Sequence, residues 1–178
     1  DKDISKAEKA GVDVLLVPEQ EYLYSGDKYE KIFSGGKGNI LEGSSRPGHF
    51  DGVLTIVNRF LSLTLPRYLV LGQKDAQQYY LIKDMLSSKF PKTQFISAPI
   101  VRDNRGLALS SRNILLEETS RNLARELFNT LKIVGFHLLR GYSQTLSLNK
   151  ARRHIMSFDS ILLDYLVVVD AETFESSN

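Results

Sequence analysis

The feature that most constrains the fold is an alternation of helical and strand-like patterns in the first part of the chain. Residues 50–65 carry apolar side chains at helical spacing, and residues 75–89 carry a second such face. Each is followed by a short, mostly apolar run, Tyr68–Leu71 and Gln94–Ser97. Helices that alternate with strands predict a parallel sheet with crossover helices, so we expect an α/β fold with a partial Rossmann-like sheet and flanking helices.

Three further segments precede this alternation. Asp1–Ala10 has acidic residues in its first turn and is predicted as a helix, with Gly11 as a left-handed C-terminal cap. Val12–Val17 is predicted as a buried strand that Pro18 ends. Residues 19–45 contain the glycine-rich sequence FSGGKGN and are predicted as a surface excursion or a hairpin. Because the chain opens without a Met, we expect it to be incomplete at its N-terminus.

The pattern changes in the last third of the chain. Residues 117–139 are predicted as one long amphipathic helix, ended by Gly141. Residues 148–158 are predicted as another helix and Tyr165–Val169 as a lone strand. One strand cannot form a sheet alone, so we expect a small, truncated α+β unit or one that pairs its strand with another chain.

The composition argues against several classes of protein. The 178 residues suffice for one domain with a small appendage, and the absence of Cys suits a reducing compartment. Lys and Arg exceed Asp and Glu only by 23 − 21 = 2, and no apolar run approaches the ~20 residues that cross a membrane. We therefore expect neither nucleic acid nor a membrane as a partner, and we interpret Lys150, Arg152 and Arg153 as a solvated helix face rather than an RNA site.

The sequence GQKDAQQ, residues 72–78, joins a predicted strand to the next helix. Ligands of open α/β sheets bind at the carboxyl ends of strands, where a helix N-terminus offers free N–H groups to an anion. Gly72 would let a ligand approach the backbone, Lys74 would meet a phosphate, and Asp75 could accept hydrogen bonds from ribose hydroxyls. The alternative is that Asp75 only caps the helix and that Lys74 is solvated.

A second informative stretch is DNRGLALSSRN, residues 103–113. It begins with a predicted tight turn, continues with a short apolar ridge, and ends with hydroxyl, guanidinium and amide groups. Ser110 and Ser111 could simply cap the helix that follows. Alternatively, these hydroxyls and the guanidinium of Arg112 bind a polyanion, because both groups donate hydrogen bonds to phosphate oxygens.

A third stretch, RPGHF at residues 46–50, precedes a predicted helix. In one interpretation His49 enters the helix and Phe50 forms a hydrophobic staple. In the other, Arg46 and His49 are polar walls of a carboxylate or phosphate pocket.

Taken in order, RPGHFDGV, GQKDAQQ and GLALSSRN, with the flanking LIKDM and APIVR, resemble the pantothenate synthetase (pantoate–β-alanine ligase) family of the nucleotidylyl-transferase superfamily. The resemblance runs from about Asp1 to DYLVVVD near the end. It implies a nucleotide-binding domain over residues 1–113 and a small lid domain over residues 114–178. It also implies a cytoplasmic, homodimeric ligase that uses ATP and Mg²⁺ to adenylate pantoate, after which β-alanine displaces AMP.

The resemblance further implies roles for matched residues in binding the nucleoside. Gly72 and Asp75 match residues that hold the ribose. Lys74 matches the lysine that meets the phosphates and stabilises the adenylated centre. Val101 and Leu109 match positions whose backbone reads the adenine.

Other matched residues are expected to bind the triphosphate and pantoate. Ser110, Ser111 and Arg112 match the clamp on the triphosphate, and we expect Ser110 and Arg112 to act catalytically beside Lys74. The expected substrate-binding residues are Gln78, Arg46 and His49.

The sequence departs from the family pattern in several places, and one of them is a phosphate-binding motif. The His-x-Gly-His that helps the family bind ATP phosphates is absent, since the histidines are His49, His137 and His154. The last two lie within helical patterns and are interpreted as structural, and no metal-ligand site is predicted. The alternative to a ligase is a nucleotide-binding and dimerising segment without turnover, and we expect this segment alone to be inactive.

Overall fold

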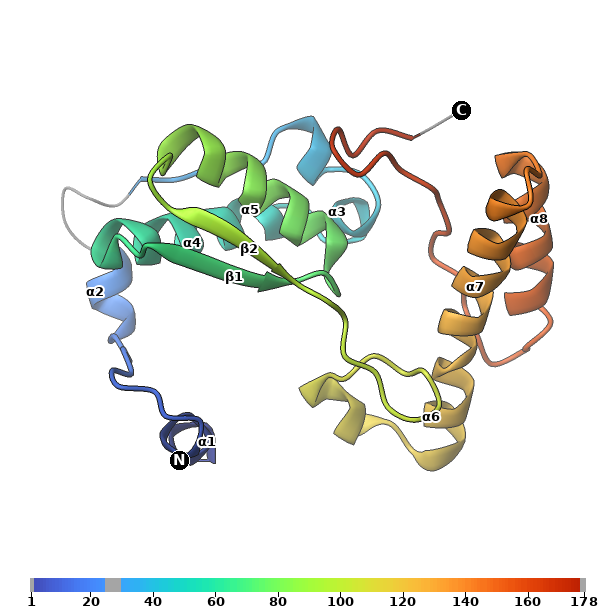
Figure 1. Cartoon of the computed structure of the whole chain (residues 1–178), viewed down its shortest axis with the longest axis horizontal. Coiled ribbons are helices and arrows are strands. Elements are labelled where there is room, and N and C mark those ends of the chain that lie inside the picture. The colour runs from blue at the N-terminus through green and yellow to red at the C-terminus, as the bar shows by residue number, and fades with distance from the viewer. Residues whose placement is uncertain (1, 25–29, 177–178) are drawn as a thin grey trace.

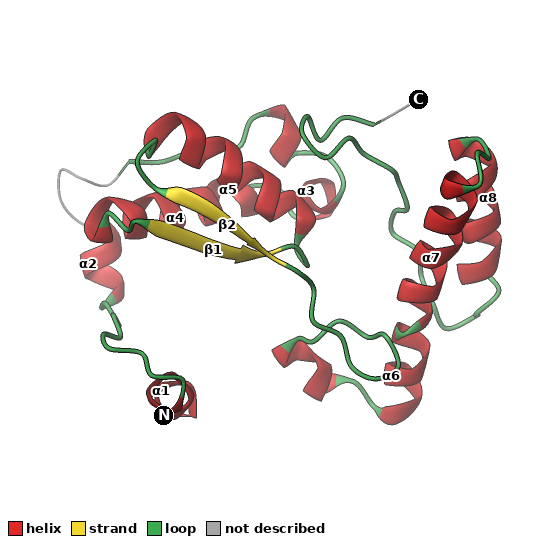
Figure 2. Ribbon diagram, in the orientation of Figure 1, coloured by secondary structure: helices red, strands yellow, loops and turns green. Residues whose placement is uncertain are grey.

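The computed structural model describes residues 2–24 and 30–176 and has an α/β fold with a small parallel sheet flanked by helices (Figures 1 and 2). β1 (Tyr68–Gly72) and β2 (Gln94–Ala98) pair in parallel, with Gly72 opposite Ala98. The predicted α/β fold and both predicted strands are therefore confirmed.

Two helices cover the same face of this sheet (Figure 1). α4 (His49–Thr64) precedes β1, and α5 (Ala76–Lys89) crosses from β1 to β2. Leu69, Leu71 and Phe95 of the strands pack against a core from both helices. The buried members of this core are Phe50, Leu54, Leu61, Leu81, Ile82, Met85 and Leu86. The helical spacing in the sequence therefore marked the faces that meet the sheet.

The glycine-rich stretch before α4 forms short helices at the surface rather than a hairpin, and among residues 30–45 only Gly38 and Gly43 are buried. It contains the short helices α2 (Gln20–Tyr24), η1 (Gly36–Gly38) and α3 (Glu42–Ser45), while residues 25–29 lie outside the described part. Gly43 packs so closely on η1 that a Cβ there would lie 1.9 Å from the carbonyl oxygen of Gly38. Glycine is required here because the backbones themselves are in contact.

Asp51 in the first turn of α4 holds this stretch in place. Its Oδ1 accepts hydrogen bonds from the backbone N–H and the hydroxyl of Ser34, at 2.8 and 2.6 Å. These two hydrogen bonds outweigh the opposing effect of partial burial and lower the pKa of Asp51. The carboxylate therefore ties the glycine-rich stretch to the core helix.

The Asp51 contact predicts a pH-dependent contribution to stability. A carboxylate with a lowered pKa stabilises the fold above its unfolded-state pKa, and this contribution is lost as the pH falls through the folded-state pKa. We expect Asp51→Ala to lower the free energy of unfolding near pH 7 by about 1–2 kcal/mol, measured by urea denaturation. The difference from the wild type should shrink as the pH falls below about 4, and a difference that does not depend on pH would contradict this account.

The prediction of a buried strand at Val12–Val17 is wrong. The segment follows α1 (Lys2–Lys9) and Gly11, whose φ of 74° confirms the predicted left-handed cap. It has no regular secondary structure, and Val14 and Val17 are 83% and 72% exposed. An apolar run forms a strand only beside a neighbour, and no described strand lies next to this one (Figure 1).

The C-terminal part contains α6 (Glu118–Ala124), α7 (Glu126–Leu139) and α8 (Gln144–Ile155). α7 and α8 pack against each other around Val134 and Ala151. Within residues 2–24 and 30–176, no helix is both long and apolar enough to cross a membrane.

Two helix boundaries here differ from the prediction. The single helix predicted over residues 117–139 is divided at Arg125, where the N–H of Phe128 bonds the carbonyl of Arg125 three residues back, at 3.1 Å. α8 begins at Gln144 rather than Leu148 because the Ser143 hydroxyl accepts the N–H of Leu146 as an N-terminal cap, at 3.3 Å.

The prediction of a strand at Tyr165–Val169 is also wrong. In the described residues, the C-terminal part consists of helices followed by an extended tail. That tail has an isolated bridge between Val169 and Ser176, and it runs back towards α5 (Figure 1). There Glu172 pairs with Lys83 at 3.3 Å, and the carbonyl of Thr173 accepts a hydrogen bond from Lys37. The division into two domains at residues 113 and 114 stays a prediction.

Candidate active site

A cavity of about 570 Å³ lies where the turn after β1, the start of α5 and the C-terminal tail meet. Its volume is typical of a small-molecule site. The predicted site residues that line it are Arg46, His49, Lys74, Asp75, Gln78, Ser110 and Arg112. The structure thus brings the three sequence motifs to one cavity, while the roles of their residues stay predictions.

α5 presents an open N-terminus to this cavity. Asp75 occupies the N-cap position, but its side chain makes no capping hydrogen bond and pairs instead with Lys74, Nζ to Oδ1, at 2.9 Å. The first turn of α5 contains no acidic residue. Free N–H groups and the partial positive charge of the helix N-terminus are therefore available to an anion in this cavity. The interpretation of Asp75 as a side-chain cap is wrong, and Lys74, although exposed, belongs to the cavity wall.

The strand ends beside this cavity are held together by the residue that follows β1. Gln73 donates its backbone N–H to the carbonyl of Ala98 at 3.0 Å and its side-chain Nε2–H to the hydroxyl of Ser97 at 2.8 Å. The carboxyl ends of the two strands therefore lie side by side. Gly72 is exposed at this edge but does not line the cavity.

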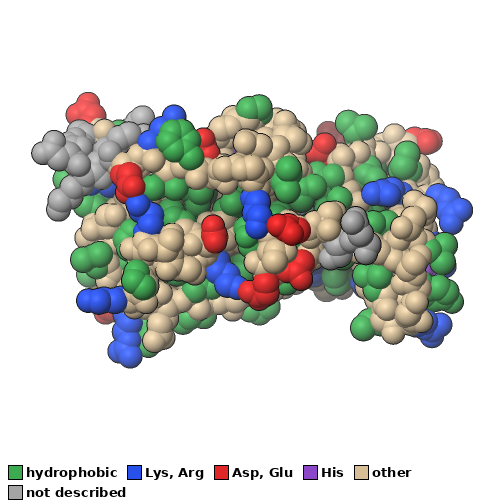
Figure 3. Space-filling view, turned by 90° about the horizontal axis from the view of Figure 1, so that it is seen from above, with side chains coloured by type: hydrophobic (Ala, Val, Ile, Leu, Met, Phe, Trp, Pro, Cys, Tyr) green, Lys and Arg blue, Asp and Glu red, His purple; other side chains and the backbone are tan. Residues whose placement is uncertain are grey.

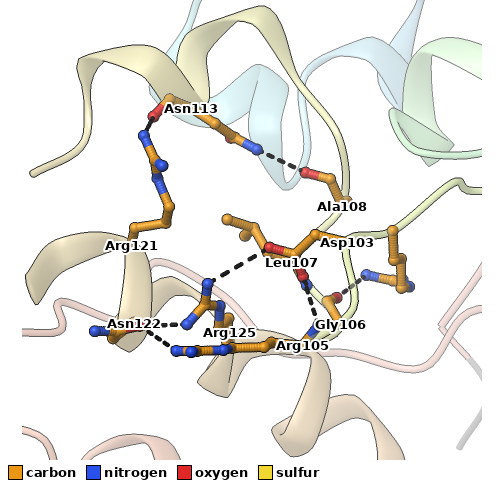
Figure 4. A network of polar contacts seen from close by, with 10 residues as sticks. Asp103, Arg105, Gly106, Leu107, Ala108, Asn113, Arg121, Asn122 and Arg125 are labelled. Atoms are coloured by element: carbon orange, nitrogen blue, oxygen red, sulfur yellow. Dashed lines mark hydrogen bonds and ion pairs between the residues drawn. The ribbon is translucent and has the colours of Figure 1, made fainter. Parts of the chain in front are cut away.

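Asp103 organises the turn that leads to Ser110–Arg112 (Figure 4). Its Oδ1 accepts the backbone N–H groups of Arg105 and Leu107, both at 2.9 Å. Burial alone would raise the pKa of Asp103, but these N–H groups and the charge of Arg125 outweigh it and lower the pKa. Gly106 has a φ of 94°, which an L side chain rarely adopts.

The two arms of this turn are hydrogen-bonded to each other. The N–H of Leu109 is donated to the carbonyl of Val101 at 2.9 Å, and Arg102 and Ala108 form a bridge. Since the Leu109 N–H is already used, an adenine could bind the backbone of Leu109 only through its carbonyl lone pairs. Neither Val101 nor Leu109 lines the 570 Å³ cavity.

Ser110 caps the short helix η2 (Ser111–Leu115). Its Oγ accepts the N–H of Arg112 at 3.3 Å, which confirms the capping interpretation for Ser110 and leaves the hydroxyl proton to donate elsewhere. Ser110 also lines a neighbouring, more open cavity of about 550 Å³ together with Ser111 and Leu109. Capping and ligand binding are therefore compatible at this residue.

Arg46 and His49 form another side of the 570 Å³ cavity. His49 is the first residue of α4, and Gly48 precedes it in a left-handed conformation without a side-chain cap. The predicted helix entry at His49 is therefore confirmed, but Phe50 lies inside the helix and in the core, so the predicted staple is wrong. Arg46 pairs with Glu42 at 3.1 Å, so an anion at Arg46 would compete with a carboxylate.

The sequence reasoning missed the wall that the C-terminal tail supplies. This wall consists of Tyr165, Val167, Val169 and Phe174. The first three alternate, and an extended segment places every second side chain on one face, which is the signal that could have identified them. Burial, with the charges of Glu42 and Asp164, raises the pKa of Tyr165, so its phenol stays neutral near neutral pH.

The described residues contain no group of three His, Cys, Asp or Glu side chains that could hold a metal ion. Two carboxylates, those of Glu42 and Asp75, line the 570 Å³ cavity. Mg²⁺ keeps several waters and commonly binds through substrate phosphates and one or two carboxylates. The donor set therefore fits a cation that enters with a phosphate ligand, not a site built by the protein alone.

Comparison with known proteins identifies the family of the chain. The sequence model of the pantoate-beta-alanine ligase family matches residues 1–178. The chain belongs to this family. The pantothenate synthetases of Pseudothermotoga lettingae and Acidothermus cellulolyticus are 39% and 37% identical to it over 98% of this chain. The matches cover 62% and 57% of those proteins, so the chain spans about three fifths of the length of these relatives.

Solved structures of pantoate-beta-alanine ligases share the fold. Pantothenate synthetase from Thermus thermophilus matches 99% of this chain with a TM-score of 0.91 and 31% identity, over 64% of its own chain. The ligase from Francisella tularensis, solved with beta-gamma ATP and beta-alanine, matches 86% of this chain and 57% of its own, with a TM-score of 0.69 and 36% identity. The resemblance inferred from the three motifs is confirmed.

Proposed function

We propose that this chain carries the nucleotide-binding part of a ligase that joins pantoate to β-alanine with ATP, through a pantoyl-adenylate. The observation that carries the proposal is the convergence of Lys74, Ser110 and Arg112 with Gln78 on one cavity beside an open helix N-terminus. Membership of the pantoate-beta-alanine ligase family supports it. The ATP and beta-alanine named with the Francisella structure are ligands of the kind proposed.

In the first step, a carboxylate oxygen of pantoate attacks the α-phosphorus of ATP. The bond from that phosphorus to the bridging oxygen breaks, and pyrophosphate leaves. Both reactants are anions, so the residues act mainly by positioning and by neutralising charge. We assign Lys74 to the transferring phosphoryl group and Ser110, Ser111 and Arg112 to the triphosphate. The N-terminus of α5 adds partial positive charge on the same side.

In the second step, the amine of β-alanine attacks the acyl carbon of the adenylate, AMP leaves with the electron pair of the acyl–oxygen bond, and the nitrogen loses a proton. We assign Gln78, Arg46 and His49 to pantoate. Pantoate must lie against the side of the cavity that these three residues form, while its carboxylate faces Lys74.

The remaining assignments concern the nucleoside and the metal. Gly72 and Asp75 hold the ribose, and the backbone of Val101 and Leu109 reads the adenine. Mg²⁺ would enter with the phosphates, near the carboxylates of Asp75 and Glu42, and would supply further neutralisation of their charge.

We also propose that the chain forms a homodimer, as the family resemblance implies. The sheet face opposite α4 and α5 exposes apolar side chains, with Val70 and Ile96 57% and 42% exposed, and such a surface permits association. Sedimentation at micromolar protein should show a dimer. A monomer over the whole concentration range would contradict this prediction.

A second candidate function is a nucleotide-binding segment without turnover. It is favoured by the absence of a His-x-Gly-His sequence from these 178 residues. The test compares the chain alone with a chimera that carries the N-terminal region of the Thermus relative before it. Pantoate-dependent exchange of pyrophosphate into ATP reports the first step.

We expect the chimera to catalyse this exchange with pantoate and without β-alanine, and we expect the chain alone to bind a non-hydrolysable ATP analogue without exchange. Exchange by the chain alone would refute the second candidate. A chimera that folds and binds the analogue but shows no exchange would contradict the proposed adenylation.

A further inference from the structure

The loop that carries Ser110–Arg112 is attached at both ends to the helices behind it (Figure 4). At its turn, Asp103 Oδ2 lies 3.7 Å from Arg125 Nη2. At its end, the carbonyl of Asn113 accepts a hydrogen bond from Arg121 Nη2 at 3.0 Å. Both arginines come from the α6–α7 region, so this region contacts the loop on either side of the clamp.

Further contacts reinforce the attachment at the turn. Asn122 Oδ1 accepts hydrogen bonds from Arg105, at 3.3 Å, and from Arg125. The guanidinium of Arg102 lies over the ring of Phe128, 3.9 Å from its centroid. Gly106 packs against that same ring, where a Cβ would lie 2.6 Å from a ring carbon.

The contacts of Arg125 with Asp103 and of Arg121 with Asn113 are partly buried, whereas the hydrogen bonds to Asn122 are exposed. The side chain of Arg125 is 15% exposed and that of Asp103 is 26% exposed. The Nε atoms of Arg121 and Arg125 are buried. Exposed ion pairs contribute little because water screens them, whereas partly buried charged hydrogen bonds restrict geometry more strongly.

The internal hydrogen bonds of the loop carry this restraint to the clamp. Asn113 Nδ2 donates to the carbonyl of Ala108 at 3.0 Å, and its N–H donates to the carbonyl of Ser110 at 3.1 Å. A shift of Arg121 would therefore move Asn113 and, with it, the residues on either side of Arg112.

We infer that Asp103 and Arg121 are positioning residues, which fix the Ser110–Arg112 clamp to α6 and α7 so that the clamp and the C-terminal helices move as one unit. Lys74 lies on the other side of the cavity, at the end of β1. The separation of Lys74 from Arg112 is then set by the position of the C-terminal helices. This inference rests on the proposed function, because that function assigns the loop to phosphate.

The test uses paired variants of the 178-residue chain. Arg121→Ala removes the donor to Asn113, while Arg121→Gln keeps an N–H donor without the charge. Asp103→Asn keeps Oδ1 as the acceptor for the turn but removes the carboxylate charge opposite Arg125. Arg153→Ala, an exposed position on α8, is the matched control.

Two measurements are made on each variant. Amide hydrogen exchange in the free protein follows residues 105–115, with α8 as the internal reference for folding. Calorimetry with a non-hydrolysable ATP analogue and Mg²⁺ gives the affinity. We expect Arg121→Ala to speed exchange at Asn113 and to lower the affinity for the analogue about tenfold, because one charged hydrogen bond is lost. Asp103→Asn should lower this affinity while the amides of the turn stay protected from exchange. Arg121→Gln and Arg153→Ala should stay close to the wild type in both measurements.

Each of the remaining outcomes would contradict one part of the proposal. Unchanged exchange in Arg121→Ala and unchanged affinity in Asp103→Asn would show that the anchors do not hold the loop. Faster exchange without weaker binding would show that the loop is anchored but that its position is irrelevant to phosphate. Equal weakening by Arg121→Gln and Arg121→Ala would make Arg121 a direct charge contact instead of a positioning residue. If the wild-type chain binds no analogue, the proposed function fails, and the clamp role of the anchors fails with it.

Discussion

Lys74→Ala is expected to lower the rate of adenylation by about 10²-fold or more, about 3 kcal/mol of transition-state stabilisation, with a much smaller effect on ATP affinity. Lys74 lies at the open end of α5, where charge on the transferring phosphoryl group would develop, and its side chain is 40% exposed. On the face of the molecule that Figure 3 shows, basic side chains lie among acidic ones. The loss of Lys74 also leaves the carboxylate of Asp75, now 2.9 Å from Nζ, without its counter-ion near the phosphates. Both effects act most strongly in the transition state, so the rate should fall more than the binding.

Steady-state and single-turnover kinetics of a form that turns over, such as the chimera with the Thermus region, measure this effect. Arg112→Ala should also raise the KM for ATP, because a guanidinium on the triphosphate binds the ground state as well. Lys92→Ala, an exposed lysine just after α5, is the matched control and should be neutral. A Lys74→Ala enzyme with unchanged kcat and only a higher KM would refute the assigned role.

Ile82→Ala is expected to lower the free energy of unfolding by about 2–5 kcal/mol. Ile82 is 1% exposed in the core between α4, α5 and the sheet, so the truncation removes buried methyl groups and leaves a cavity. Leu162→Ala changes a side chain that is 96% exposed and should stay within about 0.5 kcal/mol of the wild type.

Urea denaturation followed by circular dichroism measures both variants. Ile82→Val, expected to cost about 0.5–1.5 kcal/mol, keeps the experiment informative if the alanine variant does not fold at all. An Ile82→Ala chain as stable as Leu162→Ala would mean that the helices do not pack on the sheet as described.

The fold could be predicted where a pattern and its partner lie in the same stretch of sequence. α4, β1, α5 and β2 follow one another and pack on one another, so helical spacing and short apolar runs sufficed. Val12–Val17 has an equally strong strand pattern, but a strand needs a neighbour, and the local sequence does not say whether one is present. The same reason explains the failure at Tyr165–Val169.

The candidate site shows the same division. Lys74, Ser110 and Arg112 lie in short motifs whose residue types already indicate phosphate chemistry, and the structure brings them to one cavity. The wall from Tyr165 and its neighbours comes from a segment far along the chain, so only tertiary structure reveals it. The contacts of Arg121 and Arg125 with the loop depend in the same way on how α6 and α7 pack.

The central claim is that a nucleoside triphosphate binds between the end of β1 and the Ser110–Arg112 loop. Amide hydrogen exchange of the chain with and without a non-hydrolysable ATP analogue and Mg²⁺ tests this claim most directly. We predict that the analogue slows exchange in residues 72–78 and 109–113 and leaves α8 unchanged. Protection confined to other segments, or no protection at an analogue concentration that saturates the Thermus relative, would contradict the claim.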